Sequence, residues 1–196
     1  TYPNEQLSAG RPLKMAPAYS DMTAAGAVWG NSWDLEVPLY FAPQGFAETP
    51  SLKRSNAFDI VGGECRAVRE NVGLLDITGF SRFEVSGPNA EAWLNSVFAT
   101  KLPTPGRARL AVALGHDGRL KGDLTLSNWG DGTWWIMGSY YLRRWHMRWF
   151  DDHMQDGVTI RDLCEEMAGF SLSGPNSRAV IERLTDGPVG DLSFMG

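Results

Sequence analysis

The chain has 196 residues, of which 43% are hydrophobic and 21% are charged, with 22 glycines and 11 prolines. This composition is globular and excludes collagen, coiled coils and wholesale disorder, and the length predicts one or two domains. The net charge of −5 argues against a duplex-binding protein, so we expect no nucleic-acid partner. The longest apolar stretches fall far short of the ~20 residues that cross a bilayer, so we expect no membrane partner.

The first 57 residues form an aperiodic segment that glycine and proline interrupt, for example at Pro12 and Pro38. Its aromatic side chains, such as Trp29 and Tyr40, would be costly in water. We therefore expect a belt that wraps a surface of its own or of a neighbouring domain, and not a domain in itself.

Apolar residues become periodic after Gly63, and their spacing predicts a helix that ends at Gly73. The apolar positions of this helix are Cys65, Val68, Val72 and Leu75. Alternation from Phe80 to Val85 then predicts a strand.

An internal repeat follows, because the heptapeptide FEVSGPN at 83–89 returns as FSLSGPN at 170–176, an offset of 87 residues. Each copy predicts a strand, then Gly-Pro with the proline at the first helical position, then a helix. The predicted apolar stripes are Trp93, Leu94 and Val97 in the first copy and Val180, Ile181 and Leu184 in the second. The alternative is that Ser-Gly-Pro-Asn is only a favourable strand-to-helix turn that arose twice.

Between the copies, three strands are predicted at Ala108–Leu114, Leu120–Asn128 and Trp134–Gly138, joined by glycine-rich turns into an antiparallel meander. A helix is predicted over Tyr141–His153. Its predicted apolar stripe is Leu142, Trp145, Trp149 and Phe150. The fold class is α+β, with antiparallel sheets, packed helices and an internal strand-helix repeat. No glycine-rich nucleotide fingerprint occurs.

Asp123 is the unusual residue of the middle strand, where aspartate is depleted unless it has a specific partner. Alternation places it on the polar face with Lys121 and Thr125. One interpretation is a carboxylate that binds an amine or a cluster of N–H donors. The other is a solvent-facing carboxylate paired with Lys121 or with an arginine across the sheet, and the residues alone leave both open.

Two cysteines, Cys65 and Cys164, lack metal-ligand spacing and are expected to be buried free thiols in a reducing, cytoplasmic compartment. The three histidines, His116, His146 and His153, are expected to pack or face solvent, so no metal site is predicted. The tryptophans are expected in the core. No secretory signal opens the chain, which does not begin with Met, and we expect it to be part of a longer protein.

Four motifs carry a family resemblance. The runs Glu64–Thr78 and Phe83–Leu94, the hairpin Gly118–Thr125 with its Asp-Leu-Thr strand, and the second Ser-Gly-Pro-Asn at 173–176 resemble the folate-binding glycine-cleavage T-protein (aminomethyltransferase) family. The resemblance covers about residues 58 to 196. It implies the aminomethyltransferase folate-binding fold, incomplete at its C-terminal side.

The opening residues resemble a second feature, the connector that follows the flavin domain in dimethylglycine and sarcosine dehydrogenases. This implies a connector over 1–57 and a folate-binding domain over 58–196. The resemblance implies that an upstream domain, outside this chain, carries FAD and oxidises an N-methyl amine. The folate domain then captures the one-carbon unit on tetrahydrofolate.

The resemblance also implies roles for single residues. Asp123 matches the acidic residue near the reactive folate nitrogens and is the implied catalytic and folate-binding residue, while Thr125 matches a companion polar position. Leu110 stands where many members carry a tyrosine that faces the folate, so that contact is lost or replaced. The glutamate that grips the pterin would lie beyond Gly196.

Two alternatives stay open. One is that the chain is a non-catalytic scaffold or interaction domain of a flavoprotein. The other is that it is a stand-alone T-protein-like transferase, which would lack the aromatic belt.

The offset of 87 residues puts the counterpart of Asp123 at 210, so the second copy lacks its hairpin and should leave its helix uncovered. We therefore expect weak or no folate binding by the isolated chain, and a second chain or domain covering this copy.

Overall fold

The computed structural model describes residues 5–187, 189–190 and 192–195. The chain folds into two units: unit 1 comprises 1–79 and 167–191, and unit 2 comprises 80–166 and 192–196. Both units combine helices with antiparallel strands, which confirms the α+β class. Among the described residues, no helix has the length and apolar character that crossing a membrane requires.

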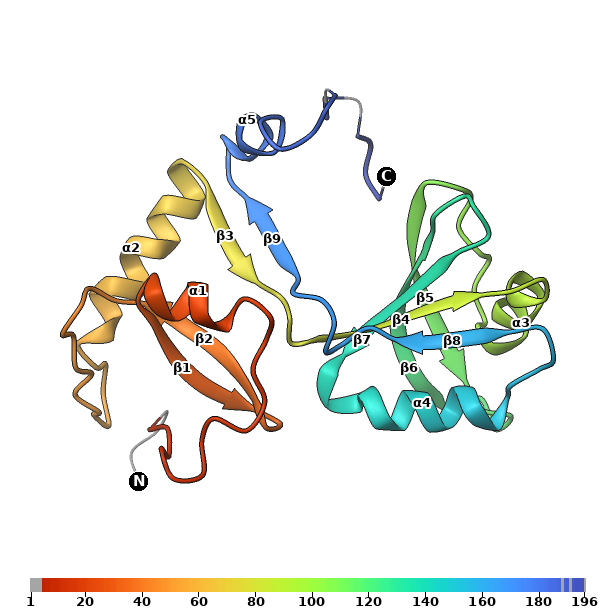
Figure 1. The fold of residues 1–196 in the computed structure, drawn as a ribbon, viewed down its shortest axis with the longest axis horizontal. Helices are drawn as coiled ribbons and strands as arrows, with labels where there is room; N and C mark the ends of the chain where they lie inside the picture. Colours follow the sequence, from red (N-terminus) through yellow and green to blue (C-terminus); the bar gives the residue numbers. More distant parts are fainter. Residues whose placement is uncertain (1–4, 188, 191, 196) are drawn as a thin grey trace. The chain divides into compact units, whose positions relative to one another are not determined.

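Unit 1 contains two separate two-stranded antiparallel sheets, β1-β2 and β3-β9, with three helices (Figure 1). Its elements are α1 (Tyr19–Ala24), β1 (Ala27–Ser32), β2 (Leu35–Phe41), α2 (Ala57–Glu70), β3 (Gly73–Asp76), β9 (Phe170–Ser173) and α5 (Ser177–Ile181).

The opening segment is more regular than its sequence suggests, since it contains a helix and a β-hairpin. The β1-β2 hairpin turns through Trp33 and Asp34, whose φ angles are 54° and 70°. Two positive φ values suit a two-residue hairpin turn, although tryptophan rarely adopts them. The ring of Trp29 stacks on Tyr19 with 4.3 Å between centroids, so these two aromatic residues pack within unit 1 itself, whereas Trp33 is 64% exposed.

The helix expected after Gly63 is displaced toward the N-terminus. Helix α2 begins at Ala57 and ends at Glu70, so Val72 lies beyond the helix, and Leu75, which was expected to be helical, lies in β3. The prediction of a buried thiol at Cys65 is wrong, because this side chain is exposed on α2. The helix therefore presents its sulfur to solvent.

Unit 2 is built around one five-stranded antiparallel sheet of order β5-β6-β7-β4-β8 (Figure 1). Its elements are β4 (Phe80–Ser86), α3 (Ala90–Val97), β5 (Arg107–Leu114), β6 (Leu120–Asn128), β7 (Trp134–Ser139), the 3₁₀ turn η1 (Tyr140–Leu142), α4 (Arg143–Asp152) and β8 (Thr159–Asp162). The expected strand at 80–85 and the expected meander are confirmed.

One face of this sheet carries the core, which α3 and α4 close. Phe150 of α4 packs edge-on against Phe83 of β4 and Trp93 of α3, with ring centroids 5.5 and 5.8 Å apart. The indole N–H of Trp93 donates to the carbonyl of His153 at 2.7 Å, so its polar atom is satisfied inside the core. We call the opposite face of the sheet the open face.

The predicted apolar stripe of the α4 helix is only partly right. Phe150 is buried, but the second buried residue of α4 is His146, and Trp145 is 44% exposed. Trp145 lies outside the core because its indole N–H donates to the carbonyl of Lys121 at 3.2 Å at the edge of the helix.

The repeat has the same turn in both copies. The N–H of Ala90 donates to the carbonyl of Gly87, and the N–H of Ser177 donates to that of Gly174, each at 3.1 Å. Both helices begin two residues after the proline, so the prediction of proline at the first helical position is wrong. The proline belongs to the turn that the glycine closes.

Cys164 lies in unit 2 and confirms the expected buried thiol. Burial raises the pKa of this thiol to about 12, and the neighbouring Asp162 adds to the effect. The protonated sulfur approaches the backbone of Arg82 and acts as a packing group.

Candidate functional site on the open face of unit 2

The alternation expected on β6 is confirmed. Gly122, Leu124 and Leu126 are buried on the core side, while Thr125 is half-buried and Asp123 is exposed on the open face. A strand that is apolar on one side only thus presents a carboxylate where it can meet a ligand.

The register of the sheet supplies the neighbours of these residues. Thr125 pairs with Leu110 of β5 and with Met137 of β7, so the three side chains form one row across the open face. Asp123 pairs with Val112 in the next row, roughly 7 Å further along the strand. The predicted residues Asp123, Thr125 and Leu110 therefore share one face of two adjacent strands.

A pocket of about 660 Å³ opens at the β5 edge of this sheet. Leu110 and Thr125 line it, whereas Asp123 lies outside its rim. Leu110 is 69% exposed, which leaves an apolar surface free at the pocket. The remaining lining residues are Lys101, Leu102, Pro103, Thr104, Arg107, Ala108, Arg109, Phe194 and Met195.

Two contacts hold the residues 192–195 against this edge. The N–H of Ala108 donates to the carbonyl of Met195 at 2.9 Å, and the Arg107 guanidinium donates to the Ser193 hydroxyl. The segment thereby forms one wall of the pocket. Neither these residues nor the cations of the rim were singled out from the sequence, and only the strand register and the chain path bring them to Thr125.

Asp123 is not engaged in the simple pairing that its sequence neighbours allow. In the part of the chain that the structure describes, no ion pair joins it to Lys121. The ammonium group of Lys121 instead lies over the rings of Trp145 and Trp149, 5.7 and 5.5 Å from their centroids. The carboxylate is therefore available on the open face.

The histidines do not form a metal centre. His146 is buried, and His116 and His153 lie near one another with ring centroids 6.3 Å apart. Within 5–187, 189–190 and 192–195, no three metal-ligating side chains come together. Burial lowers the pKa of His146, while Asp123 and the backbone of Lys121 oppose this effect, so its ring is neutral near pH 7.

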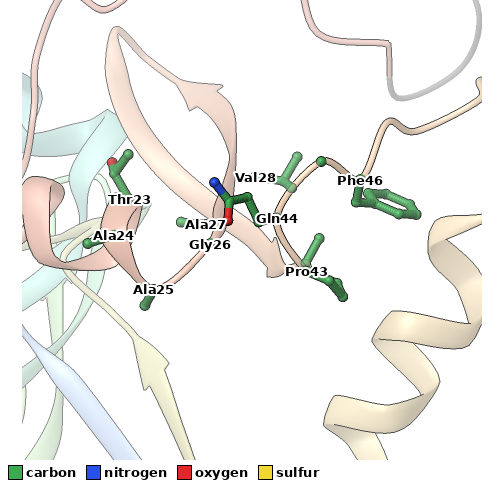
Figure 2. Close-up of a pocket in the computed structure, with 11 residues that line it drawn as sticks. Thr23, Ala24, Ala25, Gly26, Ala27, Val28, Pro43, Gln44 and Phe46 are labelled. Carbon is green, nitrogen blue, oxygen red and sulfur yellow. The ribbon is translucent and has the colours of Figure 1, made fainter.

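A second pocket, of about 640 Å³, lies within unit 1 between the α1-β1 turn and the segment after β2 (Figure 2). Among its described lining residues, Thr23 and Gln44 supply the polar side chains. The other lining residues are Ala24, Ala25, Gly26, Ala27, Val28, Ala42, Pro43, Gly45 and Phe46. Because none of these described residues is titratable, this pocket offers no acid-base chemistry.

Known proteins include longer relatives of this chain. Mouse (Mus musculus) mitochondrial dimethylglycine dehydrogenase is 27% identical over 198 residues, which covers 98% of this chain and 23% of that protein. An aminomethyltransferase of Chloroherpeton thalassium is 27% identical over 140 residues, covering 70% of this chain and 39% of that enzyme. The chain thus spans less than half of the length of these relatives.

A solved structure shows the same fold. The glycine cleavage system aminomethyltransferase T from Bartonella henselae superposes with a TM-score of 0.75 at 22% identity, covering 93% of this chain and 46% of that one. The family model described as the GCVT N-terminal domain matches residues 18–196. The chain therefore belongs to the GCVT N-terminal domain family.

Proposed function

We propose that the chain is the tetrahydrofolate-binding, one-carbon transfer module of an N-methylamine dehydrogenase of the dimethylglycine or sarcosine type. The observation that carries this proposal is the placement of an exposed carboxylate, Asp123, beside Thr125 and Leu110 on an open sheet face next to a pocket. Membership of the aminomethyltransferase family and similarity to a dimethylglycine dehydrogenase support it.

The residues present fit a folate. A volume of about 660 Å³ lies within the range of ~300–1,000 Å³ that is usual for small-molecule sites. Leu110 and Met137 offer apolar surface for a flat ring, and Lys101 and Arg107 offer cations for a carboxylated tail. When bound, tetrahydrofolate supplies the amine nitrogens that take up the one-carbon unit.

The chain's own residues would orient and deprotonate these groups. The Asp123 carboxylate accepts a hydrogen bond from a ligand amine, stabilises positive charge that develops on it, and can take its proton. The Thr125 hydroxyl, two residues along the same face, fixes the ligand's orientation. FAD would belong to a domain outside this chain, and the methylamine would be oxidised there.

The test compares Asp123→Asn with Asp117→Asn, a second carboxylate of the same hairpin, in the protein that contains the flavin domain. Formaldehyde released per amine oxidised is measured with tetrahydrofolate present. Asp123→Asn should leave amine oxidation intact and raise formaldehyde release, while transfer falls by about 10²- to 10⁴-fold and Asp117→Asn changes neither. A wild-type protein that is folded but binds no tetrahydrofolate would instead favour a scaffold role.

A cytoplasmic location belongs to the proposal too, although the mouse relative is mitochondrial.

A further inference from the structure

The core of unit 2 contains buried polar atoms whose hydrogen bonding is poor. Among the described residues, four such side-chain atoms make no hydrogen bond of normal geometry: Ser81 Oγ, both ring nitrogens of His146, and Trp149 Nε1. His146 is 2% exposed and Ser81 is fully buried. An unsatisfied buried polar atom lowers the free energy of unfolding by about 1–3 kcal/mol. Stability therefore does not explain a histidine at this position, and another role has to.

The ring of His146 occupies space that Gly122 leaves free. A Cβ on Gly122 would stand 2.8 Å from Nε2 of His146, whereas a Cβ on Gly138 would collide with Leu124 Cδ2 at 2.3 Å and lie at ordinary contact distance, 3.5 Å, from Cε1 of His146. Gly122 and Gly138 belong to the adjacent strands β6 and β7. The imidazole is therefore seated against the backbone of β6 at Gly122, while the missing side chain of Gly138 mainly makes room for Leu124.

This contact lies directly beneath the candidate site, because Gly122 precedes Asp123 in β6. The peptide that joins the two residues has the His146 ring on its core side and the Asp123 side chain on its open side. The carboxylate of Asp123 also raises the pKa of His146 against the effect of burial, so the two groups are close enough to interact. Stacking on Phe150, with ring centroids 6.3 Å apart, fixes the imidazole from below.

We propose that His146 is a positioning residue: its ring, seated against Gly122, holds the β6 backbone at the height from which Asp123 projects from the open face. The effect of this contact on catalysis rests on the proposed function. The contact itself does not depend on whether the chain binds folate. A shift of about 1 Å in a catalytic carboxylate can cost ~10²-fold in rate, so a support that does not stabilise the fold can still matter for transfer.

The experiment disturbs the contact from both sides in the intact protein. Gly122→Ala pushes a methyl group toward Nε2, His146→Ala removes the ring, and the double variant removes the collision. Two matched controls are Ile136→Ala, in the same core but on β7, and Gly63→Ala, a helical glycine whose Cβ would meet only the distant guanidinium of Arg66. Backbone amide NMR shifts of Asp123 and Thr125 are recorded together with the melting temperature.

A positioning role predicts that His146→Ala moves the Asp123 amide signal, and that Gly122→Ala moves the Thr125 amide signal, further than Ile136→Ala does. The three variants are compared relative to their losses of melting temperature. The double variant should be more stable than the sum of the single effects, because the methyl group added at position 122 then fills space that the ring has left. Transfer kcat should fall at least about 10-fold in Gly122→Ala with little change in the KM for tetrahydrofolate.

An Asp123 signal that His146→Ala leaves unmoved, or strictly additive stability effects, would overturn the positioning role. The NMR and stability measurements need no folate, so they separate this inference from the proposed function. If the amide signals shift as expected but the wild-type protein transfers no one-carbon unit, the contact is correct and the proposed function is wrong.

Discussion

The two copies of the repeat have the same turn in different surroundings. In unit 2, the strand residue Phe83 and the helix residue Leu94 are fully buried, because β4 lies between β7 and β8 and the helix closes a core. In unit 1, Phe170 is 42% exposed and none of the five described residues of α5 is buried, because β9 has only β3 as a neighbour among the described strands. The comparison separates the turn, which the repeated seven residues encode locally, from the burial of strand and helix, which depends on the neighbouring strands.

The repeated seven residues encode almost all of the turn. Gly87 and Gly174 both have positive φ, 111° and 124°, and a side chain at either would collide with a backbone carbonyl oxygen, of Gly157 and of Asn71 respectively. The side-chain amide of Asn89 donates to the carbonyl of Asp156 at 2.8 Å, and that of Asn176 donates to Asn71 Oδ1 at the same distance. Both copies therefore form the same turn, and the turn anchors each copy to a different partner segment.

The largest expected difference between the copies concerns their helices. Leu94→Ala should cost about 2–5 kcal/mol of unfolding free energy, because it leaves a cavity in the core. Ile181→Ala, the equivalent change 87 residues later, should cost about 1 kcal/mol or less, because Ile181 is only half-buried. Urea denaturation followed by circular dichroism measures both. Equal costs would show that the second helix is covered as fully as the first.

The glycines should behave alike where the helices differ. Gly87→Ala and Gly174→Ala should each cost about 1–3 kcal/mol, because each combines a strained φ with a collision against backbone. Gly106→Ala is a suitable control, since its φ is also positive, at 72°, but a Cβ there meets nothing within 4 Å. A tolerated Gly174→Ala would mean that the second turn does not hold its position in solution.

The sequence predicted those elements whose residue pattern follows directly from the structure. Alternation located β4 to β7 and put Asp123 on the open face, since a one-sided sheet must alternate. It failed at the β1-β2 hairpin, because its turn residues Trp33 and Asp34 give no glycine signal for positive φ. It also gave α2 the wrong limits, because the glycine in the middle of this helix resembles a boundary in sequence.

The candidate site could be predicted only in part. Asp123, Thr125 and Leu110 came from alternation and family resemblance, and the register confirms that they share a face. Whether they bind folate stays a prediction. For His146, packing and solvent exposure were both left open, because the space that buries its ring comes from the missing side chain of Gly122 on another element.

A smaller effect is expected at the two asparagines. Asn89→Ala and Asn176→Ala should each cost about 0.5–1.5 kcal/mol, because each removes one side-chain hydrogen bond that ties the turn to its partner segment. The change Asn71→Ala should reproduce the effect of Asn176→Ala and leave that of Asn89→Ala untouched. Double-variant cycles in urea would reveal the coupling, and its absence would show that the second copy is anchored only by backbone contacts.

The smallest expected effect concerns acid stability and one ion pair of unit 2. Asp162 accepts a hydrogen bond from Arg143 Nε at 2.5 Å and another from the N–H of Cys164 at 2.9 Å. Although burial raises the pKa of Asp162, the hydrogen bonds from Cys164 and Arg143 outweigh this effect and hold the pKa below its usual value. The group therefore stabilises the folded state fully above about pH 4, the unfolded value, and this contribution is lost as pH falls through the lower folded value.

Because the pair is partly exposed, the loss should stay below about 1 kcal/mol. Urea midpoints at pH 7 and pH 3 should differ less in Asp162→Asn than in the wild type, whereas Asp117→Asn, whose ion pair with Arg119 is far more exposed, should match the wild type. Unit 1 holds its own ion pair, in which Glu36 accepts hydrogen bonds from Arg11 at 2.9 and 2.5 Å. Measuring the same urea midpoints in Glu36→Gln therefore tells which of the two units contains the acid-sensitive ion pair. If Glu36→Gln alone flattened the pH dependence, the acid-labile contact would lie in unit 1, and the two units would differ in charge as well as in burial.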